Sequence, residues 1–108
     1  MHIQIVNFNL KDLTVNEYEE LCNTVAGAFA QVPGLVSKVW LADHASNTFG
    51  GIYTWRDEQA LRAYETSELF AAVVQNPHFA NITVHEFGVL DRPTRVTNGA
   101  PAVAAAAR

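Results

Sequence analysis

Hydrophobic and polar residues follow patterns along the chain that predict four β-strands and three helices. The strand patterns are β-branched and aromatic runs that end at turn-forming residues. They cover His2–Leu10, Leu35–Ala42, Phe49–Trp55 and Asn81–Leu90. Between the first two strands, apolar residues recur at spacings of three and four from Tyr18 to Phe29, which predicts an amphipathic helix.

Capping residues mark where the helices are expected to begin. Thr14 is followed three residues later by Glu17, which is the capping-box pattern of a helix N-terminus. Asp57 is suited to cap a second helical stretch, and a polar break at Thr66 and Ser67 divides that stretch into two short helices.

The order of these elements predicts an α+β fold of the ferredoxin-like βαββαβ type, with a four-stranded antiparallel sheet and helices on one face. A sheet that is covered on one face only has strands that alternate cleanly between apolar and polar residues. In the second strand, however, Val39 and Leu41 point to one face while Val36 and Trp40 point to the other. We therefore expect a second copy of the chain to cover the outer face in a twofold homodimer.

Length and composition favour a single domain over residues 1–90, followed by a C-terminal extension over residues 91–108. The chain has 108 residues, of which 49% are hydrophobic, and every aromatic residue lies between Phe8 and Phe87. The alanine-rich tail has the composition of a partly mobile extension. Its Pro93, Thr94 and Val96 could add an arm across a partner subunit.

The charge distribution argues against several classes of partner. Residues 1–90 carry four Lys/Arg and ten Asp/Glu, so the predicted domain is acidic and lacks the basic stripe that binds nucleic acid or anionic membranes. The single cysteine, Cys22, lies on the apolar stripe of the first helix, where we expect it to be buried. No long apolar run or secretory pattern is present, and we expect a cytoplasmic protein.

His85 is the histidine that most invites a functional interpretation, because it lies inside a predicted strand. Its side chain points to the same face of the sheet as that of Phe87. We expect this face to be covered, and a neutral imidazole there needs a hydrogen-bond partner. A histidine in such a position more often has a structural role than a catalytic one. The spacing of histidines and carboxylates fits no known metal motif, and nucleophile and dinucleotide motifs are missing. We therefore expect neither a metal nor another cofactor.

A group of polar-tipped aromatic residues and one lysine form a second set of candidates. Lys38 lies on one strand face between Val36 and Trp40, where an ammonium must be paired, reach solvent at an edge or serve a ligand. An edge or dimer-interface position is the simpler account. The aromatic residues suit either a core or a pocket for a flat aromatic ligand, and they are Trp40, Tyr53, Trp55 and Tyr64.

The hairpin register decides whether Trp40 and Tyr53 share a face of the sheet. If Asp43 pairs with Phe49, Trp40 lies beside Ile52 on the face opposite Tyr53. In a register shifted by one residue the two aromatic side chains lie on the same face. The sequence leaves both registers open.

The segment from Pro33 to Tyr64 resembles the YdhR family of monooxygenases. The matching positions are Pro33-Gly34, Lys38-Val39-Trp40, Gly50-Gly51-Ile52-Tyr53 and Ala63-Tyr64. The resemblance extends over residues 2–90 and implies a dimeric α+β barrel. It also implies similarity to antibiotic-biosynthesis monooxygenases, which oxidise electron-rich aromatic or polyketide-like small molecules with O₂ and without flavin, heme or metal.

In a monooxygenase of this kind, Trp40 and Tyr53 orient the aromatic substrate while Tyr64 and Trp55 complete the pocket. His85 is the candidate proton acceptor or phenolate stabiliser, and Asn7 is a candidate hydrogen-bond donor on the first strand. The same barrel architecture hosts other activities, so a cyclase, an isomerase or a small-molecule-binding module is the alternative.

Overall fold

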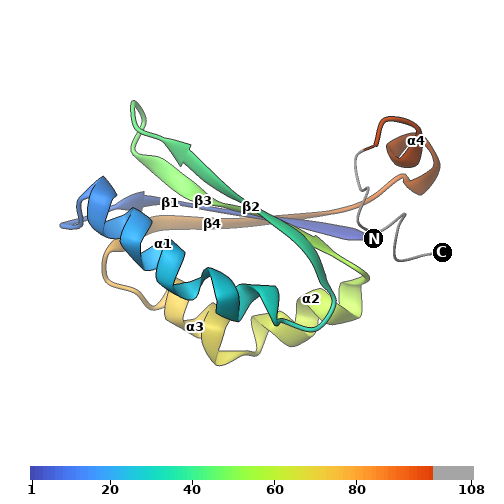
Figure 1. The fold of residues 1–108 in the computed structure, drawn as a ribbon, viewed down its shortest axis with the longest axis horizontal. Helices are drawn as coiled ribbons and strands as arrows, with labels where there is room; N and C mark the ends of the chain where they lie inside the picture. The colour runs from blue at the N-terminus through green and yellow to red at the C-terminus, as the bar shows by residue number, and fades with distance from the viewer. Residues whose placement is uncertain (99–108) are drawn as a thin grey trace.

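Four strands form one antiparallel sheet in the computed structural model, which describes residues 1–98 (Figure 1). The strands are β1 (His2–Leu10), β2 (Leu35–Asp43), β3 (Thr48–Trp55) and β4 (Phe79–Gly88), in the spatial order β2-β3-β1-β4. The helices are α1 (Val15–Ala30), α2 (Glu58–Glu65), α3 (Glu68–Val74) and α4 (Asp91–Val96). This order of elements confirms the predicted ferredoxin-like βαββαβ fold.

The helices begin at the predicted caps. The Thr14 hydroxyl accepts a hydrogen bond from the Glu17 amide at 3.1 Å, and the Glu17 carboxylate accepts one from the Thr14 amide at 2.9 Å. The Asp57 carboxylate accepts from the Ala60 amide at 2.8 Å at the start of α2. Ser67 caps α3, so the polar break separates α2 from α3 as expected. These bonds satisfy amides that have no partner within a helix.

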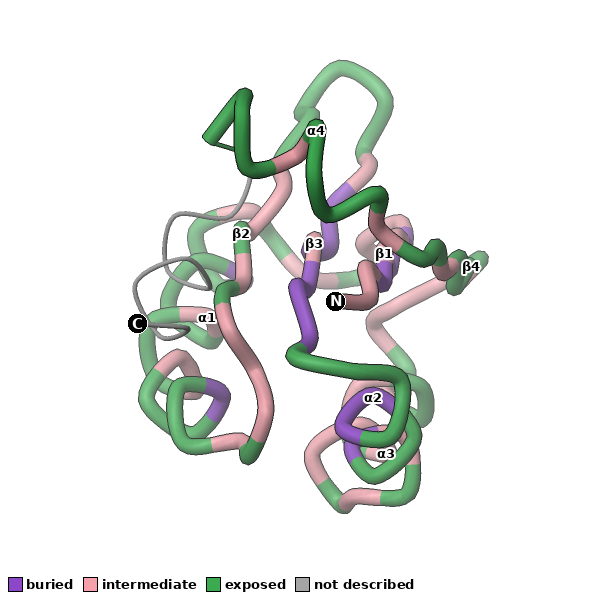
Figure 2. The backbone as a smooth tube through the Cα atoms, turned by 90° about the vertical axis from the view of Figure 1, so that its right-hand side faces the viewer, coloured by how far each residue is buried: buried purple, intermediate pink, exposed green. Residues whose placement is uncertain are grey.

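Helices α1, α2 and α3 cover the same face of the sheet, and the core lies between the two layers (Figure 1). Buried residues are concentrated along β3 and on the inner side of α2 (Figure 2). The large buried side chains of this core are Phe8, Tyr18, Phe29, Phe49, Tyr53, Trp55, Leu61 and Tyr64.

The hairpin register places the candidate residues of β2 and β3 together. Asp43 pairs with Thr48, Trp40 with Gly51 and Lys38 with Tyr53. Because paired residues share a face of an antiparallel sheet, Lys38, Trp40 and Tyr53 all project toward the helices. The sequence allowed two registers for this hairpin. The structure has the one in which Trp40 and Tyr53 share a face.

The C-terminal half departs from the predicted boundaries in the last strand and after it, and β4 ends at Gly88, two residues before the predicted end at Leu90. β4 begins at Phe79, two residues earlier than predicted, because Asn81 adopts φ 54° and the β1–β4 register shifts there. A bulge of this kind lets a strand continue through a residue that would otherwise end it. Helix α4 was not predicted, and it lies apart from the other helices (Figure 1).

The predicted division into a domain over residues 1–90 and a mobile extension over residues 91–108 stays a prediction, because the extension lies partly outside the described residues. None of the helices found in residues 1–98 has the length and apolar character needed to cross a membrane.

The second face of the sheet carries several apolar side chains, and within residues 1–98 α1, α2 and α3 leave it uncovered. Helix α4 lies on this side at one end, where Pro93 and Thr94 share a hollow with Ile3 (Figure 1). Val39 and Phe87 on this face are each 55% exposed. Between them, Ile5 of β1 pairs with Ile52 of β3 on one side and with His85 of β4 on the other. We call this surface the outer face.

Candidate functional site

A cavity of about 110 Å³ lies between the helix-covered face of the sheet and helices α1 and α3. Two hollows of about 330 Å³ and about 270 Å³ adjoin it along α1 and β2, and all three have Trp40 in their walls. An apolar protein cavity of roughly 150 Å³ holds one benzene molecule, so this one approaches the size of a single aromatic ring. Its walls include Tyr18, Cys22, Phe29, Lys38, Trp40, Tyr53 and Phe79.

Lys38 brings a positive charge into this aromatic surrounding. Its Nζ atom lies 3.4 Å from the ring centroid of Phe29, 3.3 Å from that of Trp40 and 4.7 Å from that of Tyr53. Within residues 1–98, no carboxylate lies within ion-pair distance of this nitrogen. Burial lowers the pKa of Lys38 to about 7, because desolvation disfavours the charged form.

Tyr53 presents a second polar group to the cavity, and two buried aromatic residues hold it in place. Its ring is stacked on that of Trp55, with an interplanar angle of 2° and a centroid distance of 6.0 Å. The Tyr53 and Tyr64 hydroxyl oxygens lie 3.5 Å apart, within hydrogen-bond distance of each other. Burial raises the pKa of Tyr53 far above its ordinary value, so the group stays a donor at neutral pH.

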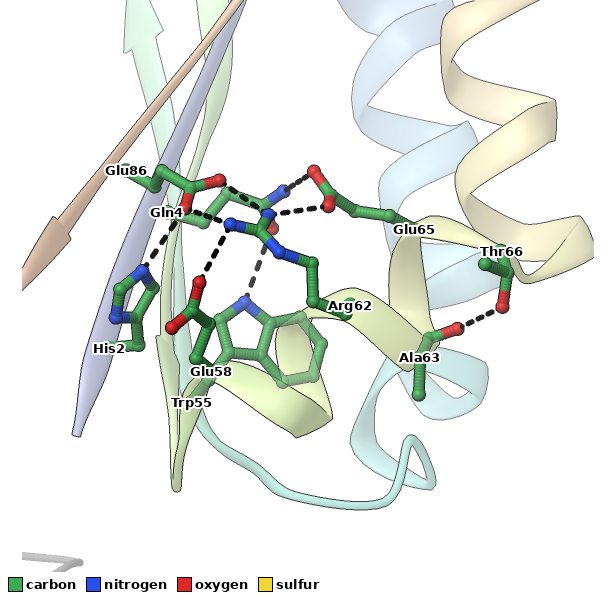
Figure 3. A network of polar contacts seen from close by, with 9 residues as sticks. All are labelled: His2, Gln4, Trp55, Glu58, Arg62, Ala63, Glu65, Thr66 and Glu86. Atoms are coloured by element: carbon green, nitrogen blue, oxygen red, sulfur yellow. Dashed lines mark hydrogen bonds and ion pairs between the residues drawn. The ribbon is translucent and has the colours of Figure 1, made fainter.

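Gln4 fixes the support behind Tyr53. The Trp55 indole donates from Nε1 to Oε1 of Gln4 at 3.2 Å, and the Gln4 amide donates to Glu65 at 3.4 Å (Figure 3). Gln4 and Trp55 are both fully buried, so this bond satisfies polar atoms that water does not reach. The sequence analysis missed Gln4. Gln4 alternates with Val6 and Phe8 along the first strand, so its side chain could have been expected on the same, core-facing side.

The described residues also include one cluster with the composition of a metal site, formed by His2, Glu58 and Glu86. Arg62 lies among these carboxylates and also pairs with Glu65 at 2.9 Å (Figure 3). The guanidinium and the His2 ring hold the pKa of Glu86 at about 2. The cluster is therefore an ion-pair network that joins α2 to β1 and β4.

The structure brings together some of the sequence-predicted site residues and separates others. Trp40 and Tyr53 line the cavity, whereas Trp55 and Tyr64 are buried behind Tyr53. Asn7 and His85 lie on the outer face, where Asn7 donates to the Phe49 carbonyl at 3.3 Å and His85 is exposed. The cavity adds residues that had no predicted site role, among them Tyr18, Cys22, Phe29 and Asn76.

Comparisons with known proteins agree with this architecture. The family model described as "Putative mono-oxygenase ydhR" matches residues 3–100. A search of curated protein sequences gave no match.

Solved structures of a monooxygenase, an oxygenase and a heme-degrader share the fold. An antibiotic biosynthesis monooxygenase superimposes with a TM-score of 0.68 at 21% identity, covering 83% of this chain and 99% of its own. The N63A mutant of SnoaB, a cofactor-independent oxygenase from Streptomyces nogalater, gives 0.65 at 22% identity, covering 83% and 94%. The heme-degrader MhuD from Mycobacterium tuberculosis, with two hemes bound in its active site, gives 0.67 at 19% identity, covering 83% and 96%.

The MhuD structures correct the expectation that the protein uses no cofactor. The same fold holds heme there, and a second MhuD structure holds manganese protoporphyrin. The absence of cofactor motifs from the sequence does not exclude a porphyrin. A porphyrin requires an axial ligand and an apolar pocket, and neither depends on a local sequence motif.

The cavity of this chain does not fit a heme as it stands. Its lining within residues 1–98 includes no histidine, and its volume of about 110 Å³ approaches that of one ring and is too small for a porphyrin. Burial also raises the pKa of the Cys22 thiol, which disfavours the thiolate that would bind iron.

Proposed function

The chain belongs to the YdhR mono-oxygenase family, and on that basis we propose that it oxidises an electron-rich aromatic compound with O₂ in the cavity beside Trp40. The observation that carries this proposal is the cavity itself, which is lined by aromatic rings and contains Lys38 and the Tyr53 hydroxyl. Aromatic walls with a few placed polar groups are typical of sites for flat small molecules.

The chemistry requires an aromatic substrate that gives up electrons readily. In the oxidation of a phenol to a quinone, one ring C–H becomes C=O, the phenol O–H proton is lost, and the second oxygen atom of O₂ leaves as water. The protein's contribution is to exclude water and to hold the ring in one orientation. Trp40 and Tyr53 provide two of the surfaces that fix the ring.

The test is oxygen consumption by the purified chain with 2,6-dimethylphenol, a one-ring phenol whose free ring C–H opposite the hydroxyl group can become the second C=O of a quinone. We expect one O₂ to disappear for each quinone formed, and we expect Trp40→Ala to lower kcat/KM by about tenfold or more because one wall of the cavity is lost. Lys11→Met is the control, since Lys11 is an exposed lysine outside the cavity lining. Equal product formation without O₂ would instead identify a cyclase or an isomerase, and binding without turnover would identify a binding module.

We further propose that the outer face is covered by a second copy of the chain. The support is the exposure of Val39 and Phe87, each 55% accessible, on a sheet whose other face is already covered by α1, α2 and α3. An apolar surface of this kind on a small protein commonly marks a subunit interface. The isologous contact of a twofold dimer would bury the same residues of both copies.

Light scattering tests the assembly directly. We expect a mass of twice 11.9 kDa for the wild-type chain and the monomer mass for Phe87→Asp. Val74→Asp is the matched control, because Val74 is an exposed apolar residue of α3, on the helical side of the molecule. A monomeric wild type at micromolar concentration would contradict the dimer.

A further inference from the structure

We propose that Lys38 accepts the proton of a phenol or enol bound against Trp40 and Tyr53 and then pairs with the resulting anion. This inference rests on the proposed function for its substrate class. It concerns a residue for which the sequence analysis preferred an edge or dimer-interface position.

The amine of Lys38 lies among aromatic rings from three elements of the fold. β2 directs Lys38 toward the helices, and its side chain ends among Phe29 of α1, Trp40 of β2 and Tyr53 of β3. Ring faces attract a cation but accept no proton and provide no negative charge. The ammonium therefore has attractive neighbours and, within residues 1–98, no counterion.

A ligand can reach the amine of Lys38. Nζ makes no hydrogen bond within the described chain, and it is not among the fully buried polar atoms without a partner there, so it keeps solvent-accessible surface. Lys38 lines both the cavity and the hollow of about 270 Å³ along β2. A ligand in this space therefore lies beside the amine.

Three other titratable side chains line the cavity that contains the amine of Lys38. α1 contributes Tyr18 and Cys22, β3 contributes Tyr53, and the cavity-lining residues of α3 are apolar. Burial raises the pKa of all three of these groups, so they stay neutral and protonated near pH 7. Lys38, with a pKa lowered to about 7, is the group whose proton occupancy changes in this range.

Lys38 can therefore act first as a base and then as a counterion. It accepts the proton of the phenol, and the resulting ammonium pairs with the phenolate. The phenol O–H bond breaks, its electron pair stays on oxygen, and the lysine nitrogen gains an N–H bond, so charge and atoms balance without an oxidant. The new ammonium then faces a phenolate in a cavity that the Tyr53 side chain also lines. A proton acceptor works best when its pKa lies near the working pH.

The experiment measures binding and not turnover, with 4-nitrophenol as the probe. At about pH 8.5 the free dye is anionic and Lys38 is largely neutral, so binding of the anion should take up one proton per dye. Calorimetric titration in two buffers of different protonation enthalpy measures that uptake. 4-Nitroanisole, which has the same ring but cannot ionise, should bind at least about tenfold more weakly.

Three variants separate the contributions of charge, proton acceptance and fold. Lys38→Met should lose the preference for the anion by about tenfold or more without any fall in its melting temperature. Lys38→Arg should retain the preference but take up no proton, because a guanidinium is already charged. Lys11→Met should behave as wild type.

Two results would overturn the inference. One is wild-type binding of the anion without proton uptake, and the other is an unchanged preference for the anion in Lys38→Met. If Lys38→Met consumes O₂ as well as wild type, the inference fails and the monooxygenase proposal stands. If the dye results are as expected and no substrate is oxidised, the proposed function fails and the anion site remains.

Discussion

Replacing Gly50 with alanine tests the close approach of β1 and β3 beneath the cavity. Gly50 adopts φ 141°, a conformation that residues with a side chain rarely adopt. A Cβ atom there would lie 1.8 Å from the Val6 carbonyl oxygen and 2.8 Å from the Val6 carbonyl carbon. Both are backbone atoms of the neighbouring strand, so no change of rotamer can relieve the overlap.

The expected loss of stability follows from two separate costs. Overpacking in a filled interior costs about 1–3 kcal/mol, and an unfavourable positive φ costs about 1–3 kcal/mol. We therefore expect Gly50→Ala to lower the free energy of unfolding by about 2–6 kcal/mol, a large part of the roughly 5–15 kcal/mol of a typical domain. The melting temperature should fall by more than about 8 °C.

Urea denaturation followed by circular dichroism measures this loss, and Gly27→Ala is the matched control. Gly27 lies in α1, where a Cβ atom would meet nothing within 4 Å. The same substitution should therefore stabilise the helix there by about 0.5–1 kcal/mol. A Gly50→Ala variant within about 1 kcal/mol of wild type, with an unchanged denaturant slope, would refute the strand approach that the structure shows.

Three further predictions concern the cavity and its support. Gly51→Ala places a Cβ atom 2.9 Å from Cε of Lys38, so it should displace the flexible lysine and weaken 4-nitrophenolate binding by about tenfold, with little change in melting temperature. Gln4→Leu leaves the buried Trp55 indole without an acceptor and should cost about 1–3 kcal/mol in urea melts; a loss below about 0.5 kcal/mol would contradict this. The pKa of Lys38 is about 7 in the folded chain and 10.5 ordinarily, so the unfolded chain binds more protons between these values and this group adds stability as pH rises. From pH 7 to pH 9, the unfolding free energy of wild type should therefore rise relative to that of Lys38→Met. A difference between the two proteins that stays constant over this range would exclude the lowered pKa.

The elements of the fold were predictable because their signals are local. The capping box of Thr14 and Glu17 and the helix break at Ser67 each depend on residues within one turn of helix. β4 began earlier than predicted because the bulge at Asn81 depends on its pairing with β1, which no local pattern encodes.

The candidate site was only partly predictable because it depends on contacts between distant segments. Trp40 and Tyr53 were named from residue type, but their shared face followed from the Asp43–Thr48 pairing, which the sequence left open. His85 was placed by strand parity, and parity alone does not say which face the helices cover. The aromatic surroundings of Lys38 come from α1, β2 and β3, so they become visible only when the fold is known.

The position of β2 in the sheet has a consequence for how a ligand enters. Within the described chain, β2 is an edge strand that is hydrogen-bonded to β3 alone, and it contributes Lys38 and Trp40 to the cavity. Local opening of an edge strand breaks one ladder and leaves the remaining sheet intact. We expect amide hydrogens of β2 to exchange with deuterium faster than those of β1, and bound ligand to slow that exchange. Fluctuation of this strand would then set the rate of ligand entry and release while the core between β1, β3 and α2 stays closed.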